Sequence, residues 1–339
     1  MHVFGSRNPS AVDPGLSSIS AVDPGLSSAR KKRELIRTAR LKMHPHGLGW
    51  EGVSAMAARE RADLEKEAQY IHAMHDEDGT RIIVTMFADG AEMLLRADTS
   101  YNDNTYKRTA GDWKEWEVVV WNAQLERRVT VARIYCTHET REAFAKMWKC
   151  LWDTAERLTG ERVKFHFLDG SGIKVILVDG CKRQAEGLGD DLVQRCMRSN
   201  NPMFAGKILD PLDLVQHLLK TCITHFERKL DDLAKTCPAD VMAEIRRCQF
   251  VKTQEELAVL VQSYKNSPYK CVRDWIVDKD QSPWFFPSIN EHLSKIPERI
   301  WYETDNTTNL NESAHPFTNQ MTGTGRPLVE SIEQYVLYY

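Results

Sequence analysis

The sequence predicts an α/β fold, in which a mixed β-sheet precedes a long helical region. Two β-branched runs, residues 116–121 and 128–135, are joined by a short polar loop and predict an antiparallel hairpin. Residues 175–178 form an unbroken apolar run, which is typical of a strand covered on both faces. From residue 210 to 297 no comparable β-branched run occurs, so we expect this region to be helical.

The composition is that of a globular protein with a sizeable core. The chain has 339 residues, of which 42% are hydrophobic and 27% charged, enough for one large domain or two smaller ones. A net charge of -3 excludes a general nucleic-acid coat protein, so any nucleic-acid contact must be local. No apolar run approaches the about 20 residues of a membrane helix. We also expect no signal peptide, and the eight cysteines lack disulfide-framework spacing, which predicts reduced thiols.

Residues 1–52 read as a disordered leader. The nonamer at 10–18 recurs unchanged at 20–28, and two copies are too few for a solenoid, which needs at least about three repeats. A basic cluster follows, interpreted equally well as a nuclear-localisation or phosphate-binding arm and as the start of a solvated helix. Its members are Arg30, Lys31, Lys32, Arg33, Arg37, Arg40 and Lys42.

The remaining elements follow from propensity and periodicity. We expect helices over 55–75, 88–96, 139–158 and 184–196, and further strands over 81–87, 100–108, 163–168 and 174–179. If 163–168 is only an edge piece, the order from residue 100 is β-β-β-α-β-α. A meander of three strands, a helix and a buried strand ending on an acid is the order of the ribonuclease H-like fold. The predicted organisation is therefore a first core part at 53–209, a helical insertion at 210–297 and a last core part at 298–339.

Three acids occupy informative positions in this order. Asp103 lies in the first strand of the meander, Asp179 ends the buried strand, and Glu312 follows a Thr/Asn run that predicts a helix N-cap. Asp179-Gly180 alone is also an ordinary turn sequence. In open α/β sheets, however, ligands bind beyond the carboxyl ends of the strands. Strand acids with a distant helix acid suit two-metal phosphoryl chemistry, in which two ions stabilise the attacking and leaving oxygens.

Residues from about 81 to 336 resemble the catalytic domain of MULE (Mutator-like element) transposases of the fungal type. The resemblance rests on motifs that follow one another in the same order: Asp103-Asn-Thr-Tyr-Lys-Arg, Val129-Thr-Val-Ala-Arg-Ile-Tyr, Val178-Asp-Gly, and Thr308-Asn-Leu-Asn-Glu-Ser-Ala-His. It implies a DDE triad at Asp103, Asp179 and Glu312 that holds Mg²⁺ or Mn²⁺. Asp98, also followed by Thr and close to an aromatic residue, is an alternative to Asp103.

Cys222 and His225 look like the C-x-x-H pair that these transposases carry in their helical insertion. Their spacing places both on one side of a helix, so they can reach one ligand. A structural zinc would need two more ligands, for which Cys237, Cys248 and His217 are candidates without close spacing. We therefore favour a packed or hydrogen-bonded pair near the active site over zinc.

The resemblance implies DNA cleavage and strand transfer, with transposon ends and target DNA as partners, in the nucleus. Neither a Cys/His module before residue 52 nor one after Cys271 is present, which leaves recognition of transposon ends in doubt. The alternatives are a catalytically silent or domesticated nuclear DNA-binding protein and, less favoured, a cellular nuclease on the same scaffold. Self-association is left open.

Overall fold

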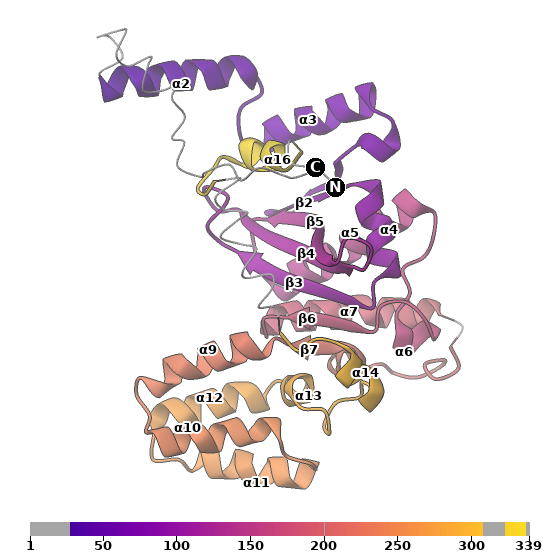
Figure 1. Cartoon of the computed structure of the whole chain (residues 1–339), viewed down its shortest axis with the longest axis vertical. Coiled ribbons are helices and arrows are strands. Elements are labelled where there is room, and N and C mark those ends of the chain that lie inside the picture. The colour runs from indigo at the N-terminus through magenta and orange to yellow at the C-terminus, as the bar shows by residue number, and fades with distance from the viewer. Residues whose placement is uncertain (1–27, 200, 308–322, 337–339) are drawn as a thin grey trace, which may run out of the picture.

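The computed structural model describes residues 28–199, 201–307 and 323–336. In these ranges the strands form one seven-stranded sheet in the order β1-β2-β5-β4-β3-β6-β7 (Figure 1). The strands are β1 Ile71–Glu77, β2 Thr80–Met86, β3 Thr99–Thr105, β4 Lys114–Asn122, β5 Arg127–Cys136, β6 Val175–Val178 and β7 Leu219–Thr221. The pairs among β1 to β5 are antiparallel, whereas β6 runs parallel to β3 and β7 parallel to β6. The predicted α/β class with a mixed sheet is confirmed, and the strand order is compatible with a ribonuclease H-like fold.

The helices are grouped by their place in the chain. The first group comprises those that precede β7 together with the last helix, and the second comprises those between β7 and that last helix. The first group is α2 Ala29–Met43, α3 Trp50–Asp63, α4 Ala88–Arg96, α5 Arg141–Thr159, α6 His166–Asp169, α7 Lys182–Arg198, α8 Pro211–Leu214 and α16 Leu328–Val336. The second group is α9 Ile223–Ala234, α10 Ala239–Arg246, α11 Gln254–Lys265, α12 Lys270–Asp280, α13 Phe285–Ile289 and α14 Glu298–Glu303. In Figure 1, α9 to α12 lie at the β7 end of the sheet and α2, α3 and α16 at the opposite end.

One face of the sheet packs on α4, α5 and α7. The large core cluster on this side includes Trp116 from β4 and Trp148 and Trp152 from α5. Helix α5 begins where the Thr140 side chain accepts a hydrogen bond from the Ala143 N–H, and it ends at Gly160 in the left-handed conformation. Gly187 lets α7 approach α5 closely, because a Cβ there would lie 2.6 Å from the Phe144 Cβ.

The other face carries charged and polar residues next to a smaller apolar cluster. There α3 and α16 pack over β1, β2 and β5 through residues such as Val53, Ile83, Tyr135 and Ile332. A separate, smaller apolar cluster lies nearer β6 and consists of Tyr101, Val119, Leu177 and Cys222. This face, left uncovered by α5 and α7, is the one that carries the candidate site.

Two local predictions were wrong. The helix expected over 55–75 ends at Asp63, and β1 then pairs with β2 through a turn in which Asp78 and Gly79 have positive φ angles. An Asp-Gly pair between strands is a strong hairpin signal that helix propensity outweighed in the prediction. The strand expected over 163–168 is mostly the short helix α6, and only Phe165 bridges to Ile173.

Two ranges contain elements that the sequence did not predict. Strand β7 lies inside the range 210–297, which was expected to be almost wholly helical. Its three residues, Leu219–Thr221, are too few to form a recognisable β pattern. Within the leader expected to be disordered, residues 29–43 form α2 and α3 begins at Trp50. The duplicated nonamer, apart from Ser28, and Glu312 lie outside the described residues. No described helix is long and apolar enough to cross a membrane.

Candidate metal centre

The register of β3 and β6 brings Asp103 and Asp179 together. Tyr101 on β3 pairs with Leu177 on the parallel strand β6, and each aspartate lies two residues further along its strand direction. Because side chains alternate with a period of two, both carboxylates fall on the same face of the sheet. Neighbouring strands lie about 4.8 Å apart, which brings the two side chains close together. This edge is the crevice beyond the carboxyl ends of parallel strands, where α/β sheets bind ligands.

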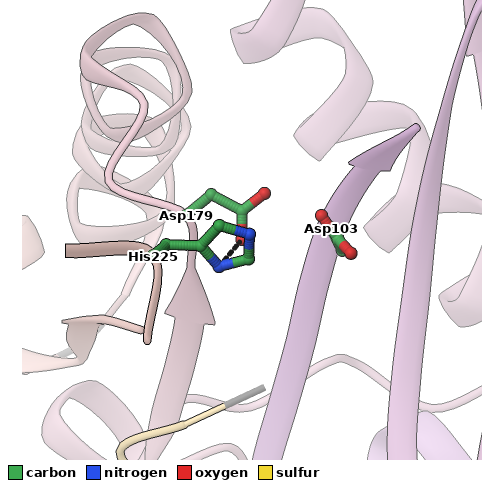
Figure 2. A group of neighbouring side chains, drawn as sticks. All are labelled: Asp103, Asp179 and His225. Carbon is green, nitrogen blue, oxygen red and sulfur yellow. Dashed lines mark ion pairs between the residues drawn. The ribbon is translucent and has the colours of Figure 1, made fainter. Parts of the chain in front are cut away.

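His225 completes the group from the next strand connection. Strand β7 ends at Thr221, and α9 begins at Ile223, so His225 lies in the first turn of a helix that starts at the same sheet edge. One ligand atom from each of Asp103, Asp179 and His225 lies within 4.8 Å of the others. Figure 2 shows the imidazole alongside the Asp179 carboxylate, with Asp103 facing them from the neighbouring strand.

The protein compensates the charge of Asp179 only in part: the Lys229 ammonium opposes the effect of burial on its pKa, but it is the last of the causes in size. Its Oδ1 is buried and lies 3.1 Å from Nδ1 of His225, but the contact lacks hydrogen-bond geometry and this oxygen has no other hydrogen-bond partner. Burial, and then the neighbouring Asp103 carboxylate, raises the pKa of Asp179 well above its usual range. The nearby Lys229 ammonium donates instead to the main-chain oxygen of Asp179, at 2.8 Å. A cation between the two carboxylates would relieve this repulsion.

The turn after Asp179 depends on Gly180. Its φ of +72° lies in the left-handed region, and a Cβ there would stand 2.9 Å from the Thr221 Cγ2 of β7. The Lys229 ammonium also reaches the Gly180 main-chain oxygen, at 3.4 Å. The turn is therefore fixed against both β7 and α9, and it presents the Asp179 side chain to the site.

The alternative first acid, Asp98, lies outside this group. It precedes β3, is 66% exposed at its side chain, and pairs with Lys174 at 2.9 Å. Asp103 is buried at the other end of the strand. The geometry therefore favours Asp103 for a shared site.

The other predicted metal ligands are dispersed. Cys222 is buried in the cluster of Tyr101, Val119 and Leu177, and its N–H donates to the Val178 carbonyl at 2.8 Å. The ring of His217 stacks on Phe167. Cys237 lies beside Cys271, with their Sγ atoms 2.8 Å apart, and Cys248 is buried in the large core cluster. In the described part of the chain these residues form no zinc site.

A rim of polar contacts beside the site was not predicted from the sequence. The Tyr101 hydroxyl donates to Asp305 at 2.5 Å, and the Arg128 guanidinium pairs with the same carboxylate at 2.8 Å while lying over the Tyr101 ring. The Ile223 N–H donates to the Asn306 carbonyl at 2.9 Å. Tyr101 and Asp305 are 204 positions apart in sequence, and Ile223 and Asn306 are also far apart, so no local pattern could have revealed these contacts.

Two carboxylates and an imidazole form a ligand set that could hold a metal ion. No family model, curated protein or solved structure matches the chain.

Proposed function

We propose that the protein is a metal-dependent phosphodiester-cleaving enzyme acting on DNA, of the DDE transposase type. The observation that carries the proposal is the convergence of Asp103 and Asp179 on one sheet edge. Two carboxylates side by side, each raising the cost of ionising the other, are expected where a divalent ion is bound.

The residues fit Mg²⁺ or Mn²⁺, which prefer oxygen ligands. Asp103 and Asp179 would hold the ion, which when bound supplies charge stabilisation to the reacting phosphate and lowers the pKa of bound water. The imidazole of His225 lies 3.1 Å from Oδ1 of Asp179 and is placed to contribute a ligand atom to the same ion. Lys229 fixes the main chain of Asp179.

The position of the neighbouring chain supports Glu312 as the third acid. The Thr307 hydroxyl lies 2.9 Å from that of Thr224, the residue before His225. Glu312 is five residues further in the sequence, a span of at most about 18 Å even for an extended chain. After this segment, the Gly325 N–H donates to the Lys107 carbonyl at 2.8 Å, just beyond the Asp103 end of β3.

The finer assignment as a transposase core, with a ribonuclease H-like fold, a helical insertion and a nuclear location, rests on the motif resemblance. The strand order is compatible with that fold. The helices α9 to α13 fall between Asp179 and Glu312 in the sequence, as the proposed insertion requires. DNA is accordingly the proposed substrate, and strand transfer follows cleavage by attack of the freed 3′-hydroxyl on target DNA.

The test is nicking of supercoiled plasmid by the purified chain with Mg²⁺ or Mn²⁺. Asp103→Asn, Asp179→Asn and Glu312→Gln should each lower the nicking rate by at least about 100-fold, because losing an electrostatic contact in the transition state costs about that much. Asp98→Asn is the matched control, since it removes an equal charge near the other end of β3, and it should keep the wild-type rate.

Three results would overturn parts of the proposal. Wild-type nicking by Asp179→Asn would refute the metal site. Loss of activity in Asp98→Asn alone would identify Asp98, and not Asp103, as the first acid of the triad. Metal binding without nicking would favour the catalytically silent DNA-binding protein.

A further inference from the structure

Helix α2 concentrates positive charge in a protein whose overall charge is negative. Its fifteen residues hold seven Lys and Arg and one Glu, against a net charge of -3 for the whole chain. All of the basic side chains are exposed except that of Arg40, which is half-buried. The metal centre uses none of them. This helix therefore needs an explanation of its own.

Four of these residues form one stripe. Arg30, Arg33, Arg37 and Arg40 recur at spacings of three and four, which places them along one side of the helix. At a rise of about 1.5 Å per residue, the stripe is about 15 Å long. A groove of about 470 Å³ runs beside it, lined by Arg33, Arg37, Arg40, Leu41 and His44 among others.

The end of the stripe nearest the body is fixed by ion pairs to α16. Arg40 pairs with Glu330 at 2.6 Å, and His44 lies 3.5 Å from Glu333. In Figure 1 the rest of α2 extends away from the sheet. The helix is thus held at its C-terminal end and presents Arg30, Arg33 and Arg37 outward.

We propose that α2 binds the phosphate backbone of duplex DNA along this arginine stripe. Duplex DNA carries one negative charge per about 1.7 Å of its axis, so a 15 Å stripe faces several phosphates. Arginine suits them, because its planar guanidinium binds phosphate oxygens in pairs. The proposal rests on the proposed function only for the choice of DNA as the nucleic acid.

An anionic membrane is the competing partner, because Leu35, Ile36 and Met43 are also exposed on α2. Two features count against it. Lys32 falls on the same side as Leu35 and Met43, which interrupts the apolar side, and the helix has no aromatic residue of the kind that anchors interfacial helices.

The experiment is fluorescence anisotropy of a labelled 30-base-pair duplex with the full chain in EDTA, repeated over a range of NaCl concentrations. The triple variant Arg30→Gln, Arg33→Gln, Arg37→Gln should bind at least about tenfold more weakly. Its slope of log affinity against log salt should be shallower by about 2.7, or 0.9 for each lost phosphate contact. The matched control removes three basic residues from the opposite face of the sheet, Lys149→Gln, Arg162→Gln, Arg198→Gln, and should bind as the wild type does.

An unchanged affinity and slope in the α2 variant would overturn the proposal. Equal losses in both triple variants would do so too, since they would reflect net charge alone. Co-sedimentation with phosphatidylserine vesicles that depends on the three arginines, with DNA binding unaffected, would assign the helix to membranes. Because EDTA removes divalent ions, this assay is independent of the nicking test, and either proposal can fail without the other.

Discussion

Two clusters of buried charge lie side by side on the same face of the sheet, and they differ in how the charge is compensated. In the first, Arg108 and Arg133 bind Glu115 and Glu117 at distances of 2.7 to 3.1 Å. The second is the candidate metal centre. Glu117 stands directly opposite Asp103 in the β3–β4 register, so the clusters adjoin.

The neighbouring charges shift the pKa values of Glu115 and Asp179 in opposite directions. Burial raises the pKa of Glu115, but Arg108 and Arg133 oppose that shift, and the Tyr335 hydroxyl donates to Glu115 at 3.1 Å. Burial also raises the pKa of Asp179, and there the nearest carboxylate, Asp103, adds to the shift. In the first cluster two guanidinium groups face two carboxylates, although Oε2 of Glu115 has no hydrogen-bond partner, and Tyr335 ties α16 to the sheet. In the second, the neighbouring carboxylate outweighs Lys229 in its effect on the pKa of Asp179, and a bound cation would reverse that balance.

The largest effect is expected on breaking the first cluster, in which Arg108 and Arg133 pair with Glu115 and Glu117. Arg133→Met should destabilise the protein by about 3–5 kcal/mol, because it leaves buried carboxylates without one of their partners. The free energy of unfolding in urea measures this. Arg127→Met, at an exposed position on the same strand, is the control and should change stability by no more than about 0.5 kcal/mol. A loss below about 1 kcal/mol in Arg133→Met would mean that the cluster is not structural.

The second cluster should respond to metal where the first does not. Mn²⁺ at 100 times its dissociation constant should stabilise the wild type by about 2.7 kcal/mol, because it binds only the folded state. Asp179→Asn should lose this stabilisation, and in EDTA it should be no less stable than the wild type, since it removes a repulsive charge. Asp98→Asn should respond as the wild type does. Thermal melts with and without Mn²⁺ give the comparison. Equal stabilisation of all three proteins would contradict the interpretation that Asp103 and Asp179 hold the ion.

The sequence predicted the two aspartates of the site, but not the polar contacts beside them. Strand 175–178 and the acid after it could be recognised because four apolar residues in succession report burial on both faces. Asp103 could be placed on its strand, but choosing it over Asp98 required the β3–β6 register, which no local pattern encodes. His225 was signalled by its spacing from Cys222, although the spacing could not tell that the imidazole faces Asp179 while the thiol packs in the core.

Long-range pairing explains most of what was missed. The turn at Asp78-Gly79 was readable from the sequence, but β1 is polar at its exposed end, and its first part falls within 55–75, where Ala, Glu, Arg and Leu favoured a helix. Arg128 and Asp305 meet only because β5 and the segment after α14 fold against Tyr101. The cluster of Arg108, Arg133, Glu115 and Glu117 likewise joins β4, β5 and the loop after β3 to Tyr335 near the end of the described chain.

His72, near the far edge of the sheet, extends the comparison to a buried base. Its Nε2 donates to the Met86 carbonyl at 2.8 Å, while its Nδ1 is buried without a hydrogen-bond partner. Burial, and then the positive charge of Arg157, lowers the pKa of His72 to about 4. As at Asp179, a neighbouring charge shifts the pKa in the same direction as burial does. His72 is therefore neutral in the folded protein at neutral pH.

The sign of the pH dependence follows from proton binding. Between pH 6.5 and about 4 the unfolded chain binds a proton at His72 that the folded chain does not, so this part of the stability is present above pH 6.5 and is lost as the pH falls towards 4. After allowance for partial exposure, the loss should be about 2 kcal/mol. His72→Gln can keep the hydrogen bond to Met86 without titrating, so it should lack this loss. Because both proteins share all other titrating groups, the difference between their urea stabilities at pH 7 and pH 4.5 isolates His72, and parallel profiles would show that it is not held neutral by burial.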